Sequence, residues 1–317
     1  MLQLPKMKKV ITLLCSLVIF ISAIFSQQKT IQERLGYSKD TKLLIIHADD
    51  LGVSQSENEA SIYAMEKGSV SSGSIMVPCP WMGDIAAYAS SHPNADLGLH
   101  LTLTSEWAQY KWPTVTPVNE ASSLINKNGF FYSATDSLYM HANINEVEKE
   151  IRAQIERAKQ FGIDPTHFDA HMGCMFGTAA YLELLIKLSR EYKVPVLLNK
   201  DAFKMMYSID ISTYTNDKDV LTDRIFMAQP NDFKTGMANY YTSSIKSIQP
   251  GLNCILLHAA YENNEMKAVT INHPDYGAAW RQADFNFFTS KECSDLIKQQ
   301  KIKIITWKEI RDKLIRN

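Results

Sequence analysis

Short apolar runs alternate with helical patterns from Lys42 onward, and this alternation constrains the fold more than any other feature of the sequence. Such runs, when helices separate them, are typical of parallel strands joined by crossover connections. The predicted strands are residues 43–48, 73–77, 96–103, 166–171, 194–199, 224–228, 254–258 and 302–306. The sequence therefore predicts an α/β fold.

The number of units favours a barrel over an open, doubly wound sheet, since seven or eight units over about 275 residues suit a closed barrel. The turn after the first strand reads Asp49-Asp50-Leu51-Gly52 and lacks a glycine-rich phosphate loop. We expect a distorted (β/α) barrel of seven to eight units, in a single domain at 41–317. Segments 105–143 and 200–222 interrupt the alternation, and we expect these long loops to form walls or lids of the site.

Helix starts are marked by capping patterns, in which a short polar residue precedes a glutamate by three positions. The pairs are Ser54 with Glu57, Thr289 with Glu292 and Asn145 with Glu148. Val147, Ile151 and Ile155 repeat at helical spacing, which predicts an apolar stripe packed on the sheet rather than a cofactor site.

The first 26 residues have the layout of a secretory signal peptide. Three lysines precede an apolar run at 10–25, and polar residues resume at Ser26. The alternative is a permanent membrane anchor, but a run of about 16 residues is shorter than the ~20 that a spanning helix needs. We expect residues 1–26 to be removed on export to the periplasm or the extracellular space, leaving no stable membrane span. Residues 27–40 are then expected to form a polar, irregular linker.

Charge and cysteine content restrict the function classes further. The formal net charge is −1 and the charged residues are scattered, which argues against a nucleic-acid partner. The cysteines after the predicted signal are widely spaced and form no CxxC pair, so we expect buried thiols rather than a disulfide framework or a structural zinc site. These cysteines are Cys79, Cys174, Cys254 and Cys293, and an oxidising compartment leaves their pairing open.

Histidine and aspartate residues recur in the predicted strands, mostly at the carboxyl ends. They are Asp49 and Asp50 after the first strand, His100 in the third, His167, Asp169 and His171 at the fourth, and His258 at the seventh. Because the carboxyl ends of barrel strands converge on one face, these residues should meet in one pocket. One carboxylate with two imidazoles is a common way to hold a divalent ion with positions open for water and substrate.

Each of these residues also has a structural explanation. The acidic pair is equally consistent with a solvated turn that caps the following helix. A single histidine among apolar residues, such as His100 or His171, is more often a core residue than a ligand. His47 and His167 lie shortly before the other candidates, and we expect these two and Asp169 to support the ligands or the fold rather than to bind an ion. Considered jointly, the pattern favours a metal site.

Four segments resemble the motifs of the YdjC family of carbohydrate deacetylases, which includes chitooligosaccharide deacetylases. They are H-A-D-D-L-G at 47–52, L-G-L-H-L-T-L at 97–103, P-T-H-F-D-A-H at 165–171 and L-L-H-A-A-Y at 256–261. The resemblance implies a barrel related to polysaccharide deacetylases. It also implies a metal-dependent hydrolase that removes N-acetyl groups from amino-sugar oligosaccharides or related carbohydrates.

The resemblance implies roles for five residues. Asp50, His100 and His171 would bind a divalent metal ion, Zn or Mg; Asp49 would be the general base and His258 the general acid. The residue chemistry agrees with these roles, because a divalent cation lowers the pKa of water and polarises the acetyl carbonyl. The base can then take the proton of the water, and the acid can protonate the leaving amine.

Two departures from the family pattern concern the base. Family members often carry Asn where this chain has His47, and they tend to place an Arg at the end of the strand that corresponds to 194–198. This chain has Asn199 and Lys200 there. Either Lys200 or Arg281 takes the place of the missing arginine, or the site is tuned differently. His47 in turn either reaches the metal or shifts the base.

Aromatic residues near the long loops and after the seventh strand are candidates for stacking against sugar rings. The candidate substrate contacts are Trp107, Tyr261, Trp280 and Arg281. The alternatives are loop anchoring for the aromatic residues and a surface ion pair for Arg281.

Two rival functions stay open at this level. One is a metal-dependent amide or ester hydrolase that acts on a non-sugar substrate, and the other is a catalytically inactive exported sugar-binding protein. The complete set of ligand, base and acid candidates favours catalysis. The sequence leaves open which sugar and which metal are bound, and whether the chain forms a homodimer.

Overall fold

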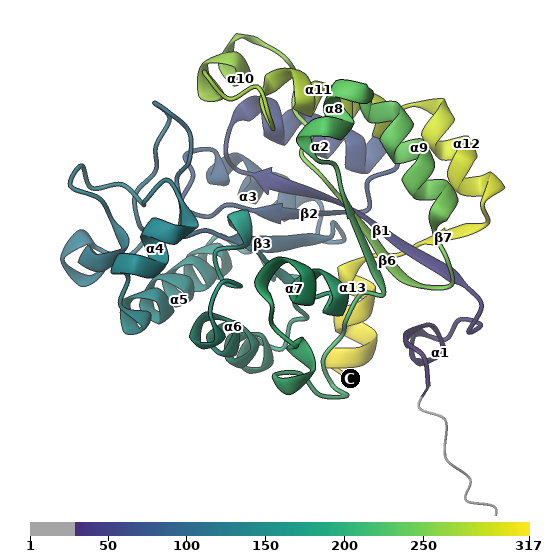
Figure 1. Ribbon diagram of the computed structural model, residues 1–317, viewed down its shortest axis with the longest axis horizontal. Helices are drawn as coiled ribbons and strands as arrows, with labels where there is room; N and C mark the ends of the chain where they lie inside the picture. Colours follow the sequence, from purple (N-terminus) through teal and green to yellow (C-terminus); the bar gives the residue numbers. More distant parts are fainter. Residues whose placement is uncertain (1–28) are drawn as a thin grey trace, which may run out of the picture.

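A curled parallel sheet forms the centre of the computed structural model, which describes residues 29–317 (Figure 1). Its seven strands are β1 (Lys42–Leu51), β2 (Ser72–Ile75), β3 (Leu97–Leu101), β4 (Phe168–Ala170), β5 (Arg224–Met227), β6 (Gly251–Leu257) and β7 (Ile302–Ile304). They lie in the order β4-β3-β2-β1-β6-β5, and β7 pairs with the first residues of β1. The expected distorted α/β barrel is confirmed.

Helices wrap the outer face of the sheet, with α2, α8, α9, α11 and α12 on one side and α4 to α7 on the other (Figure 1). The helices are α1 (Ile31–Leu35), α2 (Gln55–Lys67), α3 (Met82–Ser91), α4 (Thr135–His141), α5 (Ile144–Gln160), α6 (Ala179–Tyr192), α7 (Lys200–Tyr207), α8 (Pro230–Thr235), α9 (Met237–Ser247), α10 (Asn264–Val269), α11 (Ala278–Phe288), α12 (Lys291–Gln299) and α13 (Trp307–Ile310). Short 3₁₀ turns follow at 118–120, 122–124, 171–173 and 211–213, and a π-helical turn at 311–315.

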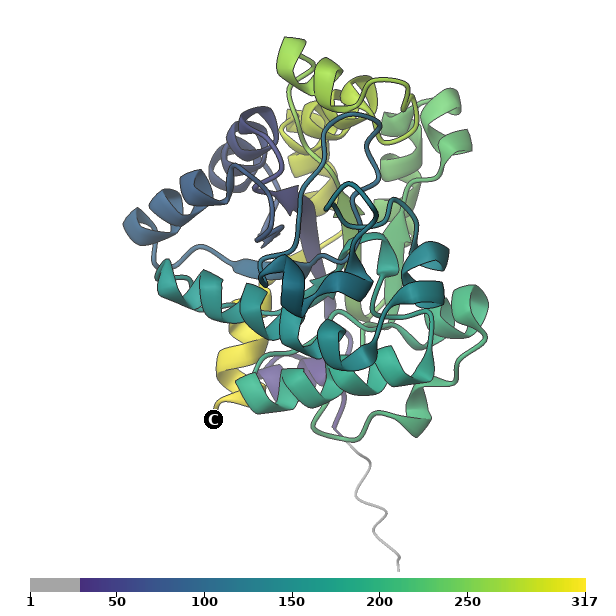
Figure 2. The same ribbon diagram turned by 90° about the vertical axis from the view of Figure 1, so that its left-hand side faces the viewer.

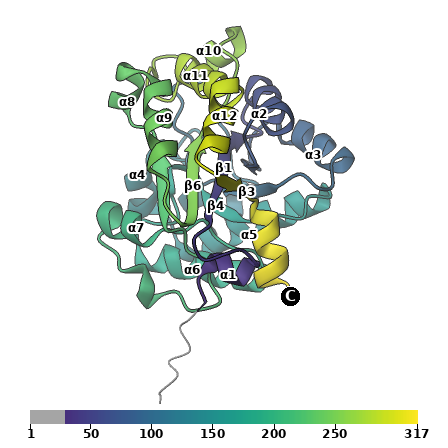
Figure 3. The same ribbon diagram turned by 90° about the vertical axis from the view of Figure 1, so that its right-hand side faces the viewer.

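Alternation along β1 separates the inside of the barrel from the outside. Leu43 and Ile45 pack with Cys254 and with Trp307 of α13 in an inner cluster. Leu44, Ile46 and Ala48 pack in the larger cluster that extends to the helices. All of β1 from its second residue is buried, as a central strand covered on both faces requires. The inner cluster fills the amino-terminal end of the barrel, where α1 and α13 lie (Figure 3).

One predicted strand is wrong. Residues 194–199 make only isolated parallel bridges, Phe168 with Val196 and Asn199 with Thr222. Pro195 lacks an N–H donor, so this segment cannot form a regular ladder with β4. The bridges nevertheless place the segment between β4 and the start of β5, and they make this part of the barrel wall irregular.

Two predicted helix starts are also wrong. Ser54 caps α2 as expected, by accepting a hydrogen bond from the N–H of Glu57. The cap of α12, however, is Ser290, because the hydroxyl of Thr289 donates to Phe285 at the end of α11. The cap of α5 is Asn143 instead of Asn145.

The amino-terminal part differs from the expected irregular linker at 27–40. Thr30 and Glu33 form a capping box at the start of α1, and Leu35 is buried in the inner cluster. The predicted signal peptide lies outside the described residues. Within 29–317, none of the helices has the length and apolar character needed to cross a membrane. The four cysteines of this part of the chain are buried and unpaired.

Candidate metal and catalytic site

Strand alternation brings most of the predicted site residues to the inner face of the barrel. His47 and Asp49 continue the series of Leu43 and Ile45 along β1. His258 follows Cys254 at a spacing of four residues, just after the end of β6. Side chains at even spacing share one face of a strand, so these groups point into the carboxyl-terminal mouth.

Asp50 reaches the same mouth by a different route, because adjacent strand residues ordinarily face opposite sides. The pairing of β1 with β2 is irregular between Ala48 and Leu51, and Asp50 has a φ of 67°. Such a bulge with one left-handed residue re-aims a side chain. Both carboxylates of the acidic pair therefore face the site.

Asp50, His100 and His171 converge on one point. Oδ1 of Asp50 lies 3.4 Å from Nε2 of His100 and 3.3 Å from Nδ1 of His171. All three side chains are buried, and their ligand atoms lie close enough to hold a metal ion. Among residues 29–317, Oδ1 of Asp50 has no hydrogen-bond partner. A buried carboxylate oxygen without a partner is costly, and a cation between the three groups would satisfy it.

The far nitrogen of each imidazole is bound to a carboxylate. Nδ1 of His100 lies 2.7 Å from Oδ1 of Asp169, and Nε2 of His171 lies 2.8 Å from Oε2 of Glu106. Metal-binding histidines usually have such a partner, which fixes the orientation of the ring. The sequence interpretation missed Glu106; its position in the long loop after β3 was the available signal.

Arg281 is a buried ion-pair partner and not a surface group. Its Nη2 donates to Oδ2 of Asp50 at 2.7 Å and its Nη1 to Oε2 of Glu57 at 2.8 Å. Burial alone would raise the pKa of Asp50, but the charge of Arg281 and the two imidazoles hold it well below its ordinary range. Of the two proposed substitutes for the family arginine, Arg281 reaches the acidic pair, whereas Lys200 is exposed at the start of α7.

Asp49 lies between two histidines. Its Oδ1 is 3.0 Å from Nε2 of His47, and its Oδ2 is 3.8 Å from Nε2 of His258. Burial lowers the pKa of His258 to about 4, so this imidazole is neutral at neutral pH. His47 also contacts Asp169, which links the neighbourhood of Asp49 to that of His100.

A second buried carboxylate holds the backbone at His258. Oδ2 of Asp284 accepts the N–H of His258 at 2.9 Å, and Oδ1 accepts the hydroxyl of Tyr241 at 2.7 Å. Burial raises the pKa of Asp284 to about 7. The sequence interpretation did not identify Asp284, because nothing in its local sequence connects it to β6.

His167 is buried but lies outside the hydrogen-bonded network. Its Nδ1 contacts the hydroxyl of Thr166 and its ring stacks on Trp307. Its Nε2 is 3.9 Å from Asp169, beyond hydrogen-bond distance. Gly98 permits this placement, because a Cβ there would lie 2.3 Å from the ring.

The predicted substrate contacts are less accessible than expected. Trp107 is 3% exposed, packs edge-on against His273 and lies over Arg281. Trp280 is 1% exposed and packs between Phe233 and Tyr276. Both rings therefore anchor loops and helices in this structure.

Two further predicted contacts also have internal partners. The ring of Tyr261 packs against Phe285, and Arg281 is fully engaged by Asp50 and Glu57. The loop that carries Trp107 lies beside the region of α10 and α11 (Figure 2). It thus forms a wall of the mouth, as the interruption at 105–143 predicted.

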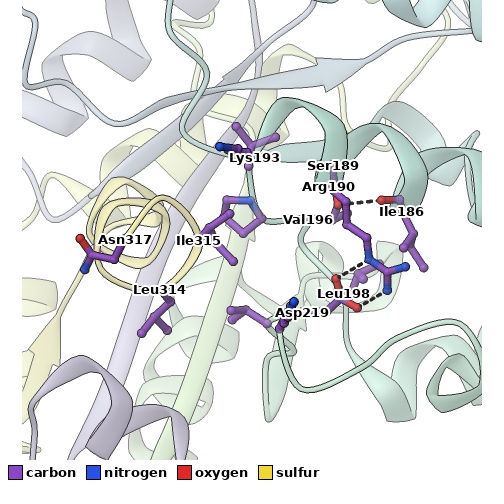
Figure 4. Close-up of a pocket in the computed structure, with 14 residues that line it drawn as sticks. Ile186, Ser189, Arg190, Lys193, Val196, Leu198, Asp219, Leu314, Ile315 and Asn317 are labelled. Atoms are coloured by element: carbon purple, nitrogen blue, oxygen red, sulfur yellow. Dashed lines mark hydrogen bonds and ion pairs between the residues drawn. The ribbon is translucent and has the colours of Figure 1, made fainter.

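A separate cavity of about 530 Å³ lies among α6, the 216–220 turn and the last residues of the chain (Figure 4). Its lining includes Arg190, which is paired with Asp219, together with Val196 and Leu314. Its lining includes none of the candidate metal ligands and neither Asp49 nor His258, so cavity size does not identify the site.

Comparison with known proteins agrees with this geometry. Residues 43–299 match the family described as YdjC-like protein. The chain is 28% identical over 288 residues to the carbohydrate deacetylase of Thermus thermophilus, covering 89% of this chain and 98% of that protein. It is also 28% identical over 276 residues to the carbohydrate deacetylase of Brevibacillus brevis, covering 84% and 99%.

A solved structure shares the fold. It is that of a protein from Enterococcus faecalis V583 assigned to cellobiose-phosphate cleavage, with a TM-score of 0.69, 22% identity, and coverage of 85% of this chain and 99% of that one. Because the family match spans most of the sequence and includes all four motifs, the chain belongs to the YdjC-like family.

Proposed function

We propose that this protein is a metal-dependent hydrolase that removes N-acetyl groups from amino-sugar oligosaccharides or related carbohydrates. The observation that carries the proposal is the unpartnered Oδ1 of Asp50, which lies between one nitrogen of His100 and one of His171. The names of the relatives point to the same activity, since both are carbohydrate deacetylases.

The residues present fit a divalent cation. Asp50, His100 and His171 would hold it, and two imidazoles with one carboxylate suit Zn²⁺ and also accept Mg²⁺. When bound, the ion would lower the pKa of water and polarise the acetyl carbonyl. Asp169 and Glu106 would keep the two imidazole rings in orientation.

Asp49 and His258 supply the proton transfers in this proposal. Asp49 takes a proton from the attacking water, because its carboxylate lies close to the proposed ligand His100 and is not the carboxylate that pairs with Arg281. His258 is neutral at neutral pH and must gain a proton before it can protonate the leaving amine. With Oδ2 of Asp49 only 3.8 Å from Nε2 of His258, the proton that Asp49 accepts has a short path to the acid.

Acetate release from N-acetylglucosamine oligomers tests the proposal directly. We expect release that stops on chelation and returns with Zn²⁺ or Mg²⁺. A panel of non-sugar amides and esters separates this function from the rival hydrolase. Binding of the oligomers without release of acetate would instead identify an inactive sugar-binding protein.

We also propose that the protein is exported, on the basis of the three lysines and the apolar run that begin the sequence. Amino-terminal sequencing of secreted material should find a chain that starts after residue 26. Recovery of the protein only inside the cell, with Met1 retained, would refute export and leave the proposed chemistry unaffected.

A further inference from the structure

His47 occupies a position between two carboxylates that both serve the site. Its Nε2 lies 2.8 Å from Oδ2 of Asp169 and 3.0 Å from Oδ1 of Asp49. Its Nδ1 lies 3.0 Å from the hydroxyl of Ser72, which faces it across the β1–β2 pair. The hydroxyl of Ser74 also lies 3.1 Å from Nε2. The ring is completely buried, so water cannot replace these contacts.

The contacts with the two carboxylates form a continuous path to a proposed metal ligand. Asp169 uses one oxygen for His47 and the other for Nδ1 of His100. Asp49 uses one oxygen for His47 and leaves the other directed toward His258. His47 is therefore the group that connects the orientation of Asp49 with that of His100.

The charge of the neighbourhood agrees with this arrangement. Two buried carboxylates adjoin one imidazole, and an unpaired buried carboxylate is strongly destabilising. Burial alone would lower the pKa of His47, but hydrogen bonds to Asp169 and Asp49 raise it to about 9. The ring is then an imidazolium at neutral pH, with N–H donors on both sides.

We propose that His47 is a positioning residue whose Nε2–H holds Asp49 and Asp169 in a fixed mutual arrangement, and so sets the general base relative to the metal ligand His100. The inference rests on the proposed function for the roles of base and ligand. It assigns His47 no contact with the substrate or the ion.

The neighbouring His167 provides a matched control. It is equally buried, its ring lies edge-on to that of His47 at 4.8 Å, and it is hydrogen-bonded to neither carboxylate. Replacing either histidine with Leu removes a buried imidazole from the same core. Only the change at His47 also removes a donor from Asp49 and Asp169.

The experiment compares His47→Leu, His47→Gln and His167→Leu for Zn²⁺ affinity, measured by competition with a chelator, and for kcat and KM of acetate release. Glutamine can present an amide N–H near the position of Nε2 without a charge. For His47→Leu we expect kcat to fall up to about 100-fold, little change in KM, and Zn²⁺ affinity lower by about tenfold, in the range for lost partners of ligands. His47→Gln should recover most of both losses. His167→Leu should lower thermal stability while the folded fraction keeps its Zn²⁺ affinity and kcat.

Two results would overturn the inference. One is equal Zn²⁺ affinity and kcat in His47→Leu and His167→Leu, and the other is His47→Gln as impaired as His47→Leu. If His47→Leu does not fold, the Zn²⁺ affinities of His47→Gln and His167→Leu are compared instead. A larger loss of affinity in His47→Gln than in His167→Leu contradicts the inference. If the wild-type protein releases no acetate, the proposed function fails, while the Zn²⁺ affinities still decide the role of His47.

Discussion

Replacing Arg281 with Met should be among the most destabilising single changes in this protein. The guanidinium is 1% exposed and donates to two buried carboxylates, at 2.7 Å to Asp50 and 2.8 Å to Glu57. Its Nε also donates to the carbonyl oxygen of Tyr276 at 2.8 Å. Methionine fills a similar volume but donates no hydrogen bond.

The magnitude follows from which carboxylate is left charged. Burial raises the pKa of Glu57 well above its ordinary range, so Glu57 can be neutral without its partner. Asp50 has its pKa held low partly by Arg281 itself, and without it Asp50 would be a buried carboxylate that has lost its guanidinium partner. Breaking a buried ion pair from one side costs about 3–5 kcal/mol. That is a large share of the roughly 5–15 kcal/mol that stabilises a typical domain.

Arg190→Met is the matched control, since Arg190 forms a two-bonded pair with Asp219 but is 45% exposed. Exposed pairs contribute at most about 1 kcal/mol. Urea unfolding of the metal-free proteins at neutral pH should therefore show a loss of about 3–5 kcal/mol for Arg281→Met and of less than about 1 kcal/mol for Arg190→Met. Equal losses in the two variants would refute the assignment of Arg281 as a buried counter-ion of Asp50.

Four further variants test separate parts of the site. Asp50→Asn should lose bound Zn²⁺ and acetate release together, whereas Asp49→Asn should keep the metal and lose only release; metal analysis of both variants shows whether the two roles are distinct. His258→Ala should keep its metal and lower turnover by about 10²–10⁴-fold, the range for a lost general acid, and a stable, metal-loaded variant with near-normal release would end that assignment. Burial raises the pKa of Asp284 from 3.8 to about 7. The folded state therefore binds the proton more tightly than the unfolded state does, and the contribution of Asp284 to stability is fully present below about pH 4. A stability of about 4 kcal/mol is then lost as the pH rises through about 7. Between pH 5 and pH 8, the free energy of unfolding measured in urea should therefore fall less for Asp284→Asn than for the wild type. Parallel plots of that free energy against pH would contradict the raised pKa.

The barrel and the convergence of site residues were predictable because both depend on local periodicity. A short apolar run such as 43–46 is typical of a buried strand in a chain that alternates such runs with helical patterns, and alternation then places His47 and Asp49 on one face. The carboxyl ends of parallel strands share an edge, so His258 had to lie near them. These steps need no knowledge of distant contacts.

The supporting groups could not be predicted in the same way, because they depend on tertiary contacts. Arg281 meets Asp50 across 231 positions of sequence, and its spacing carries no sign of that pairing. Glu106 reaches His171 from a loop whose path is set by side-chain packing. The left-handed conformation of Asp50 is equally invisible, since aspartate is compatible with an ordinary strand end.

One helix links the two sides of the proposed site. Arg281 and Asp284 lie three positions apart on α11, and residues at that spacing share a face of a helix. Arg281 holds the carboxylate of Asp50 at the end of β1, while Asp284 holds the backbone of His258 at the end of β6. Because β1 and β6 are neighbours paired along most of their length, the helix spans the ends of both strands. The distance between the proposed metal ligand and the proposed acid is therefore set by a rigid element and its buried polar contacts, as a preorganised site requires.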